Sequence, residues 1–465
     1  MEADYIDNYI LVRNALSEYS RDAWSFGNFP SLSLALCKLQ GITSCSGTIQ
    51  PRYDWKNQAY ETNNLMVNGK NAGTIYKPDV DVLLAEAKPA PFGRGEETVF
   101  DESVRKGLQI PASELGIANL SSLVSYEIDY LVPNKYKFIA KLYKMHIYLP
   151  GGHFDLHRDT PHAPNHLATL VVALPSCFQG GNLTLMDYKE VKSFPLGSLP
   201  MPETPSDTET EESIKQAERL ITTRNDSKET AKCHWVAFYT DVEHKVETVL
   251  SGTRIVLQFD LLAVPDTYDV YEETGIADWL AVFPERTIRK YRFGTNEKEN
   301  LWTSQDRKTG AVSQDAVKDL ASQIESLLRE DPNRHFALVL KHRYTTKSLR
   351  PELLKSVDQL LWTELSNTFD ISIIPLLIEE TGDDETTNFV SIRPFDLTKT
   401  ALQNDKNVKM KEKCPTYLIT GSTQSEGVHM YSQSYIEHTG NEAQFAEDKY
   451  LVSCLIVHNI KECME

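Results

Sequence analysis

The sequence predicts an α+β protein in which a strand-rich N-terminal domain is followed by a second domain of mixed helices and strands. Three observations predict this. Strand-like runs separated by short turns follow one another from residue 123 to residue 261. The last run, residues 254–261, alternates an apolar face with a partly polar face, as expected of a barrel wall with a ligand cavity on its inner side. After residue 265 the pattern changes to helical stripes and short apolar strands.

The composition is that of an ordinary globular protein and narrows the range of partners. The chain has 465 residues, of which 41% are hydrophobic and 25% charged, enough for two or three domains with full cores. Its 48 basic and 66 acidic residues give a net charge of −18. This balance argues against nucleic acid as the principal partner, because phosphate binding needs clustered Lys and Arg. Since no apolar run approaches the ~20 residues that span a bilayer, we expect no membrane insertion.

The cysteines and the first residues indicate a reducing compartment. The seven cysteines are scattered and contain no Cys-x-x-Cys pair, which suits free thiols better than a disulfide framework. The acidic N-terminal residues are not followed by the apolar segment of a secretion signal. We therefore expect a cytoplasmic or nuclear protein, and the sequence leaves its oligomeric state open.

Residues 1–265 are predicted to form the first domain. Within it, residues 1–110 are expected to be mixed and mainly helical, with a helix over residues 6–19 and a short helix at residues 101–108. An acidic segment with few large apolar groups, residues 196–231, is expected to be an exposed insertion. Strands are predicted at residues 137–149, 168–174, 182–186, 233–239, 245–250 and 254–261.

Residues 266–465 are predicted to form a C-terminal α+β accessory domain. Its elements are a helical stripe at 317–328, a strand at 336–341, a helix at 351–365, and strands at 371–378 and 450–458. This domain contains no His-x-Asp motif followed by a further histidine in the required order, so no chemistry is assigned to it.

The stretch with the clearest chemistry is residues 148–161, Tyr-Leu-Pro-Gly-Gly-His-Phe-Asp-Leu-His-Arg-Asp-Thr-Pro. It contains two His-x-Asp pairs, His153 with Asp155 and His157 with Asp159. Residues two apart lie on the same side of an extended strand. An imidazole and a carboxylate aimed at one spot are two thirds of the 2-His-1-carboxylate site of non-heme Fe(II) oxygenases. The pairs are four residues apart, so strand periodicity leaves both open.

Two later residues complete a plausible centre. His244 lies in a distant strand-like segment and is the candidate third ligand. Arg254, ten residues further on, offers two parallel donors to a carboxylate of a cosubstrate. A lone His-x-Asp is common, but a Pro-Gly-Gly turn, a His-x-Asp, a Gly-Gly-x-Leu, a distant His and a following Arg in this order are far more specific. The alternatives are an exposed loop pair and a zinc site in a cupin-like barrel, in which Arg254 would have no role.

Residues from about 137 to 262 resemble the catalytic double-stranded β-helix, a jelly-roll or cupin-like fold backed by helices, of the prolyl 4-hydroxylase-like Fe(II)/2-oxoglutarate-dependent dioxygenases. In that family an aromatic residue precedes the metal-binding His-x-Asp by three positions. Phe154 precedes His157 by three, which selects the second pair. The resemblance implies that His157, Asp159 and His244 bind Fe(II).

The resemblance also implies a cosubstrate and a reaction. Arg254 is expected to pair with the distal carboxylate of 2-oxoglutarate, and Tyr148 to form a hydrogen bond with this cosubstrate. Much of the family carries Lys at the Arg254 position, and the acidic insertion lengthens the usual spacing to His244. The expected activity is O₂-dependent hydroxylation, with ascorbate as a stimulant, of a residue in a protein or peptide, a prolyl residue among the candidates. A small-molecule biosynthetic hydroxylase and a non-catalytic β-barrel binding protein are the alternatives.

Several further residues surround this motif. Residues 92–108 are interpreted as a capped helix behind a loop, with a lid that brings Arg94 or Arg105 to the substrate as the alternative. By parity, Gln258 and Asp260 face inward with Arg254. Most nearby histidines are expected to be structural or at the surface: His146, His153, His162 and His166.

Overall fold

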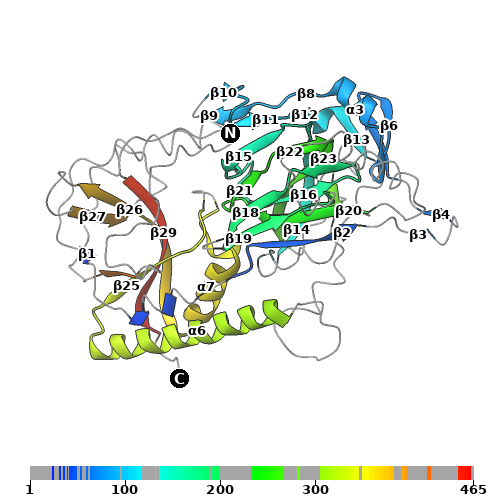
Figure 1. Cartoon of the computed structure of the whole chain (residues 1–465). Helices are drawn as coiled ribbons and strands as arrows, with labels where there is room; N and C mark the ends of the chain where they lie inside the picture. The colour runs from blue at the N-terminus through cyan, green and yellow to red at the C-terminus, as the bar shows by residue number, and fades with distance from the viewer. Residues whose placement is uncertain are drawn as a thin grey trace, which may run out of the picture. The chain divides into compact units, whose positions relative to one another are not determined.

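The chain forms two compact units in the computed structural model (Figure 1). The strand-rich unit comprises residues 43–294 with 437–443, and the C-terminal unit comprises residues 1–42, 295–436 and 444–465. The described residues Leu32, Leu36 and Leu39, which the sequence prediction placed in the first domain, pack in the core of the C-terminal unit. The structure describes residues 24–25, 31–32, 35–36, 39, 41–49, 53–54, 59–60, 63–94, 97–117, 131, 133, 136–187, 190–198, 232–265, 280–282, 304–344, 348–381, 389–394, 416–419 and 449–461.

The described residues are mostly antiparallel sheet with few helices. The larger sheet of the strand-rich unit has eight strands. In hydrogen-bonded order they are β2 (Ser44–Ile49), β20 (Cys233–Tyr239), β16 (His166–Ala173), β23 (Arg254–Pro265), β14 (Tyr136–Tyr148), β12 (Leu108–Pro111) and β8 (Lys88–Pro89), with β24 (Leu280–Val282) on β14. The long β14–β23 pairing runs antiparallel to Tyr148 opposite Arg254 and contains a bulge between Leu142 and Lys144.

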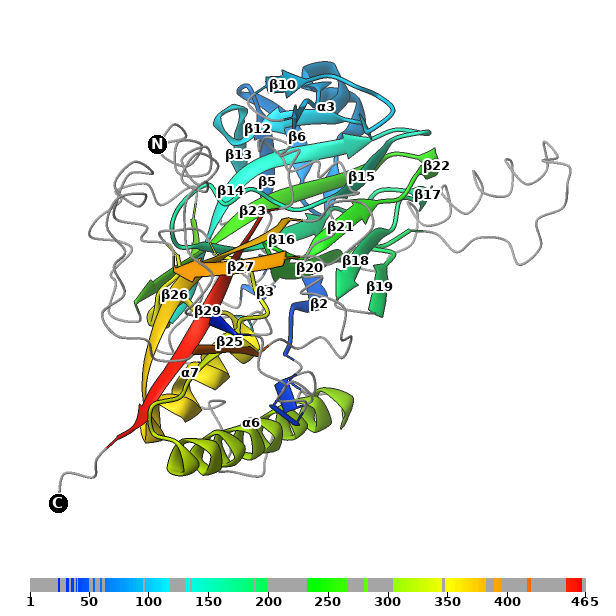
Figure 2. The same ribbon diagram turned by 90° about the vertical axis from the view of Figure 1, so that its left-hand side faces the viewer.

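A second sheet of five strands belongs to the same unit. Its order is β11 (Arg105–Lys106), β15 (His153–His157), β21 (Glu243–Val246), β18 (Leu183–Asp187) and β19 (Glu190–Phe194). Strands β15 and β21 place His157 directly opposite His244. One cavity is lined by side chains of both sheets, so the two sheets face each other as in a β-sandwich (Figure 2).

Alternation and burial explain why these segments are strands. All eight residues of β16 are buried, which agrees with a near-continuous apolar run covered on both faces. On β23 the outward residues Ile255, Leu257 and Phe259 are at most 2% exposed. The opposite face carries Arg254 and Gln258, which line the cavity. The polar inner face predicted from the sequence is therefore the wall of a cavity.

The prediction that residues 1–110 are mainly helical is wrong for the part that the structure describes. Apart from a few helical residues near Leu32 and Leu36, the helix here is α3 (Val80–Glu86), whose N-terminus is capped by Asp79. The predicted helix at 6–19 lies outside the described residues. The short strands and the one-turn helix η1 are β3 (Tyr53–Asp54), β4 (Ala59–Tyr60), β5 (Asn64–Val67), β6 (Lys70–Thr74), β7 (Lys77–Pro78), β9 (Phe92–Arg94), β10 (Glu97–Val99), η1 (Ala112–Glu114), β13 (Leu115–Ile117), β17 (Phe178–Gly180) and β22 (Val249–Gly252).

The predicted helix at 101–108 is also wrong, and the reason is a tertiary pairing. The chain turns after Asp101 and then forms β11, in which Arg105 pairs with Phe154 and Lys106 with His153. Hydrogen bonding to a neighbouring strand overrides the local helical pattern. This pairing brings Arg105 beside the His-x-Asp segment. Of the acidic insertion predicted at 196–231, residues 199–231 lie outside the described residues.

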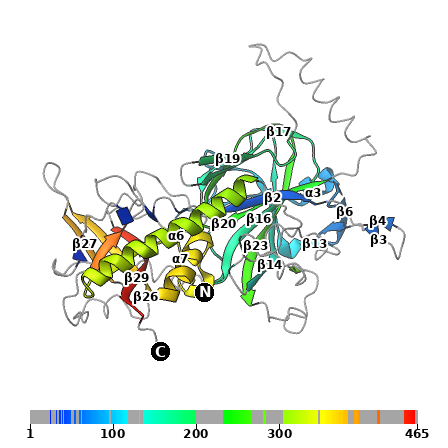
Figure 3. The same cartoon turned by 90° about the horizontal axis from the view of Figure 1, so that it is seen from below.

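In the described residues, the C-terminal unit is built on a six-stranded sheet with the α-helices α6 and α7 and the short 3₁₀ helix η4 (Figure 3). Strand β28 pairs in parallel with β1 and β25, and the other pairings are antiparallel. The sheet order is β1 (Trp24–Ser25), β28 (Thr416–Ile419), β25 (His335–Val339), β29 (Lys449–Ile460), β26 (Phe369–Thr381) and β27 (Phe389–Pro394); the helices are α6 (Ser304–Glu330), η4 (Pro351–Leu353) and α7 (Ser356–Thr368).

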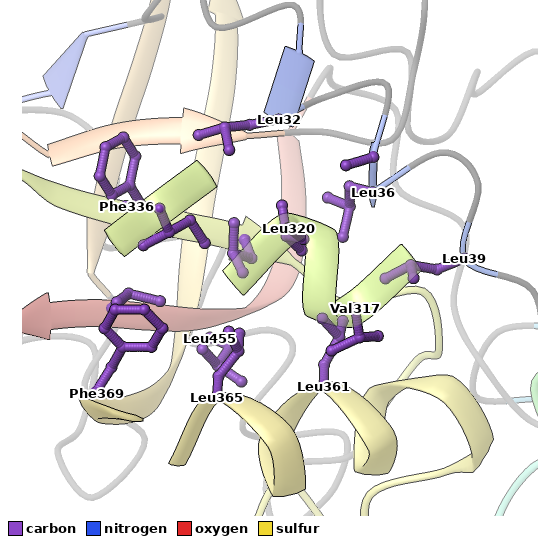
Figure 4. Packing of buried hydrophobic residues seen from close by; sticks show 14 of the residues in the cluster. Leu32, Leu36, Leu39, Val317, Leu320, Phe336, Leu361, Leu365, Phe369 and Leu455 are labelled. Carbon is purple, nitrogen blue, oxygen red and sulfur yellow. The ribbon is translucent and has the colours of Figure 1, made fainter. Parts of the chain in front are cut away.

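An apolar core joins these helices to the sheet (Figure 4). The buried stripe of α6 packs with Leu361 and Leu365 of α7 and with Phe369 and Leu455 of the sheet. Helical spacing of apolar residues produces this stripe; its members are Val317, Leu320, Ile324 and Leu328. The N-terminal residues Leu32, Leu36 and Leu39 complete the same core. Among the described residues, no helix combines the length and the apolar character needed to cross a membrane.

Candidate metal and cosubstrate site

Three of the predicted site residues meet inside the cavity. The potential ligand atoms of His157, Asp159 and His244 all lie within 4.8 Å of one another. The two imidazoles project from opposite positions on β15 and β21, with ring centroids 4.1 Å apart. Asp159 follows the end of β15, where its backbone N–H donates to the carbonyl of Thr240 at 3.2 Å. Its Oδ2 accepts a hydrogen bond of 2.5 Å from the hydroxyl of Thr169. The five-stranded sheet therefore supplies the two histidines, and Asp159, just after β15, is held by Thr169 of the eight-stranded sheet.

Both histidines are held in the tautomer that suits a metal ligand. The Nδ1 atom of His157 lies 2.7 Å from the carbonyl of Asp155, and that of His244 lies 3.0 Å from the carbonyl of Val242. A carbonyl only accepts, so each Nδ1 carries the proton and each Nε2 presents a lone pair. Burial lowers the pKa of His157 well below its ordinary value, and His244 lowers it further. A neutral imidazole is the form that binds metal.

The space between the ligand atoms also fits an ion. His244 Nε2 lies 3.8 Å from Asp159 Oδ1, which is beyond the length of a hydrogen bond. Two polar atoms thus face each other in the cavity without bonding to each other. Two imidazoles and one carboxylate are the donor set of non-heme Fe(II) sites.

The structure places the two His-x-Asp pairs in different surroundings. His153 makes hydrogen bonds outside the cavity, for example from Nε2 to the carbonyl of Ser103 at 3.2 Å, and Asp155 is exposed. A break in the β15–β21 register between Phe154 and His157 separates the two pairs. Equal parity in the sequence therefore does not give them equal orientation.

Arg254 is a buried cation for which the described residues provide no hydrogen-bond acceptor. It is only 1% exposed, and none of its three guanidinium nitrogens makes a hydrogen bond with a residue that the structure describes. The guanidinium carbon lies 5.3 Å from the centroid of the Tyr148 ring. Burial lowers the pKa of Arg254 to about 10, against a smaller opposing effect of Tyr148. Burying an unpaired charge costs several kcal/mol, so an anion in this cavity is the natural partner for Arg254.

A glycine makes room for this arginine. Gly181 has a φ of +63°, and a Cβ atom there would lie 3.0 Å from Cδ of Arg254 and 2.8 Å from Cγ2 of Val249. The second glycine of the Gly-Gly-x-Leu motif therefore serves both a left-handed turn and the packing of the Arg254 stem.

A polar network that the sequence prediction did not include lies beside the metal cluster. Arg105 donates from Nη1 to the carbonyl of Pro91 at 2.7 Å and from Nη2 to Nδ1 of His146 at 2.9 Å. Because Nδ1 of His146 accepts, its Nε2 carries the proton and donates to Oε1 of Gln258 at 2.8 Å. Burial, aided by Arg105, lowers the pKa of His146 well below its ordinary value. His146 is thus a neutral side chain that joins Arg105 of β11 to Gln258 of β23 by hydrogen bonds.

A second group with metal-ligand chemistry lies nearby, formed by His162, His166 and Asp260. His162 Nδ1 lies 2.9 Å from Asp260 Oδ2. The backbone N–H of His162 donates to Nδ1 of His166 at 3.1 Å, so the proton of His166 is on Nε2, 3.7 Å from Asp260 Oδ1. A protonated Nε2 offers no lone pair to a metal. This group is therefore a hydrogen-bonded network, and Asp260 serves it instead of lining the cavity.

The comparisons with known proteins yield structures alone. No protein-family model and no curated protein match the chain. Similar solved structures include a prolyl hydroxylase from Trichoplax adhaerens in complex with a hypoxia inducible factor oxygen degradation domain peptide fragment (14% identity, TM-score 0.24, covering 39% of this chain and 74% of the other). A Pseudomonas putida prolyl-4-hydroxylase has 13% identity and a TM-score of 0.21, covering 39% of this chain and 80% of its own.

A third similar structure is an oxidoreductase of the 2OG-Fe(II) oxygenase family from Burkholderia pseudomallei, with 14% identity and a TM-score of 0.24, covering 52% of this chain and 96% of the other. Likenesses at these TM-scores carry no argument about chemistry.

Proposed function

We propose that this protein is an Fe(II)/2-oxoglutarate-dependent dioxygenase that hydroxylates a residue in a protein or peptide, with a prolyl residue among the candidates. The observation that carries the proposal is the buried guanidinium of Arg254, which has no hydrogen-bond partner among the described residues and lies in the same cavity as the His157–Asp159–His244 cluster. A metal site and an anion site that share a cavity match a metal-chelating cosubstrate with a second carboxylate.

Each residue has a defined role in this proposal. His157, Asp159 and His244 would hold Fe(II), which with 2-oxoglutarate and O₂ supplies the oxidising power for hydroxylation and yields succinate and CO₂. Arg254 would bind the distal carboxylate of 2-oxoglutarate through parallel N–H donors. Tyr148, which lies opposite Arg254 on β14, would form a hydrogen bond with the same cosubstrate.

The surrounding groups would keep the ligands in position. The hydroxyl of Thr169 orients the carboxylate of Asp159, and backbone carbonyls fix the tautomers of both histidines. Such outer partners usually matter almost as much as the ligands themselves. A small-molecule substrate is the alternative.

The test is 2-oxoglutarate-dependent release of succinate in the presence of Fe(II) and ascorbate. We expect succinate from the wild-type protein and none from His157→Ala. Binding of Mn(II), followed by its electron paramagnetic resonance signal, should be lost in the same variant. Lys141→Ala is the matched control, because Lys141 is exposed on β14. Equal succinate release by wild type and His157→Ala, or none from either with a good substrate, would contradict the proposal.

A further inference from the structure

We propose that Arg105 and Lys144 form a second anion site in the cavity, which takes the carboxylate of an acidic residue next to the residue that is oxidised. This inference rests on the proposed function, because it assigns a peptide substrate to the same site. It adds that the substrate is an acidic peptide. The observations that support it are the surroundings of the two cations and the charge balance of the cavity.

Arg105 is a buried cation whose hydrogen bonds go to neutral acceptors. It is 8% exposed and lines the cavity. Its partners are the carbonyl of Pro91 and the neutral ring of His146, and its Nε makes no hydrogen bond within the described part of the chain. The guanidinium carbon also lies 4.4 Å from the centroid of the Phe154 ring, which in turn stacks on His157 at 3.6 Å. A stack of three planar groups therefore leads from the metal cluster to Arg105.

Lys144 lines the same cavity from the eight-stranded sheet, two residues before His146 on β14. Its Nζ makes a long contact of 3.4 Å with Oε1 of Gln109 and lies 4.1 Å from the centroid of the Tyr143 ring. No carboxylate among the described residues forms an ion pair with Lys144 or with Arg105. Burial, followed by the charge of Arg105, lowers the pKa of Lys144 to about 8. A bound anion would favour the charged form of Lys144 and offset the repulsion from Arg105.

The charges that line the cavity do not balance without a further anion. Among its described lining residues, Arg105, Lys144 and Arg254 are cationic, whereas Asp159 is the anionic one. A divalent metal and the dianion 2-oxoglutarate cancel each other, so their binding leaves this excess of positive charge in place. Positive charge inside a low-dielectric cavity attracts an anionic partner. Since Arg254 is assigned to the cosubstrate, Arg105 and Lys144 remain for the substrate.

The proposed anion site is a local region of positive charge in a chain whose net charge is negative. At −18 the protein repels acidic peptides as a whole. Selective retention of an acidic peptide would therefore come from a local site and not from general attraction. Lys141, an exposed lysine three residues before Lys144 on the same strand, provides a matched control for the loss of one positive charge.

The test uses two libraries of degenerate nine-residue peptides that are identical except that every Glu and Asp of one is Gln or Asn in the other. The full-length protein, loaded with Mn(II) and the cosubstrate analogue N-oxalylglycine, is incubated with each library, and retained peptides are quantified by mass spectrometry. We expect about tenfold greater retention of the acidic library, the factor that corresponds to about 1.4 kcal/mol for one charge-assisted contact.

Substitutions then test whether Arg105 and Lys144 cause the preference for acidic peptides. Lys144→Gln and Arg105→Gln should each reduce the ratio of acidic to neutral retention toward one, whereas Lys144→Arg and Lys141→Gln should preserve it. Lys144→Gln carries the test even if Arg105→Gln fails to fold, because Lys144 makes the single long hydrogen bond to Gln109. Equal retention of both libraries by the wild type, or an acidic preference that survives Lys144→Gln, would overturn the inference.

Retention of the acidic library measured as a function of pH is an independent test of the same site. The groups whose charges act on Lys144 are Arg105, Asp159 and Asp260. A lysine with a pKa of about 8 loses its charge as the pH rises from 7 to 9, so retention of the acidic library should fall over this range. The fall should be absent in Lys144→Arg, and its persistence there would contradict the role of Lys144.

Failure of this inference is distinguishable from failure of the proposed function. Binding of Mn(II) and N-oxalylglycine is measured before the peptides are added. Absence of that binding counts against the dioxygenase proposal. Intact binding without a preference for acidic peptides leaves the dioxygenase proposal standing and removes the acidic substrate.

Discussion

Replacement of Arg254 by Met should make the ligand-free protein more stable while removing its ability to bind 2-oxoglutarate. A residue that merely packs or pairs inside a core destabilises the protein when it is replaced. Arg254 is expected to do the opposite, because its guanidinium is buried and finds no hydrogen-bond partner in the described ranges of the chain. Methionine retains most of the apolar stem and removes the uncompensated charge.

The size of the effect follows from the pKa of Arg254. Burial lowers it to about 10, whereas arginine ordinarily has a value above about 12. At about 1.4 kcal/mol for each unit of pKa, the buried charge costs roughly 3 kcal/mol of folding free energy. The folded pKa is the lower one, so this cost is fully present below about pH 10, and disappears only above the unfolded value. Allowing for imperfect packing of Met, we expect a gain of about 1–3 kcal/mol at pH 7.

The assay is urea denaturation of the Mn(II)-loaded protein with and without 2-oxoglutarate. At a hundred times its dissociation constant, the ligand should add about 2.7 kcal/mol to the stability of the wild type and nothing to that of Arg254→Met. Lys141→Met, at an exposed position of β14, controls for loss of one charge. A ligand-free Arg254→Met variant less stable than the wild type by 2 kcal/mol or more, or one still stabilised by 2-oxoglutarate, would refute the reasoning.

Three further changes test the supporting structure. Thr169→Val removes the hydroxyl that orients the ligand carboxylate and should lower Mn(II) affinity by roughly 10- to 100-fold, measured by titration; unchanged affinity would contradict its role. Gly181→Ala should press on the Arg254 stem and weaken 2-oxoglutarate binding by about tenfold or more, whereas Gly69→Ala, with a similar positive φ but open surroundings, should not. Asp358→Ala leaves three hydrogen-bond donors without their acceptor and should cost about 3 kcal/mol or more in urea denaturation; a loss below 1 kcal/mol would contradict this.

Strand alternation made much of the cavity predictable. The inward parity of residues 254–261 placed Arg254 and Gln258 on one face, and both line the cavity. The same rule applied to residues 137–149 puts Lys144 on the face of His146 and Tyr148, so the sequence held a signal for Lys144 that the prediction did not use. Local periodicity is reliable where a strand is long and its two faces differ in polarity.

Tertiary pairing accounts for what the sequence could not supply. Residues 101–108 read as a helix because their strand, β11, is two residues long and forms only against β15. Periodicity could not separate the two His-x-Asp pairs, because the irregular register between Phe154 and His157 leaves no periodic pattern; the resemblance selected the second pair. The contact of Arg105 with His146 joins residues 41 positions apart. Such contacts arise from the fold and leave no local mark in the sequence.

The most direct measurement is a crystal structure of the complex with Mn(II) and 2-oxoglutarate. We predict that the metal is coordinated by Nε2 of His157, a carboxylate oxygen of Asp159 and Nε2 of His244, and that the distal carboxylate of 2-oxoglutarate lies on the guanidinium of Arg254. A metal bound elsewhere, or a cosubstrate that leaves Arg254 without an anionic partner, would contradict the proposed function.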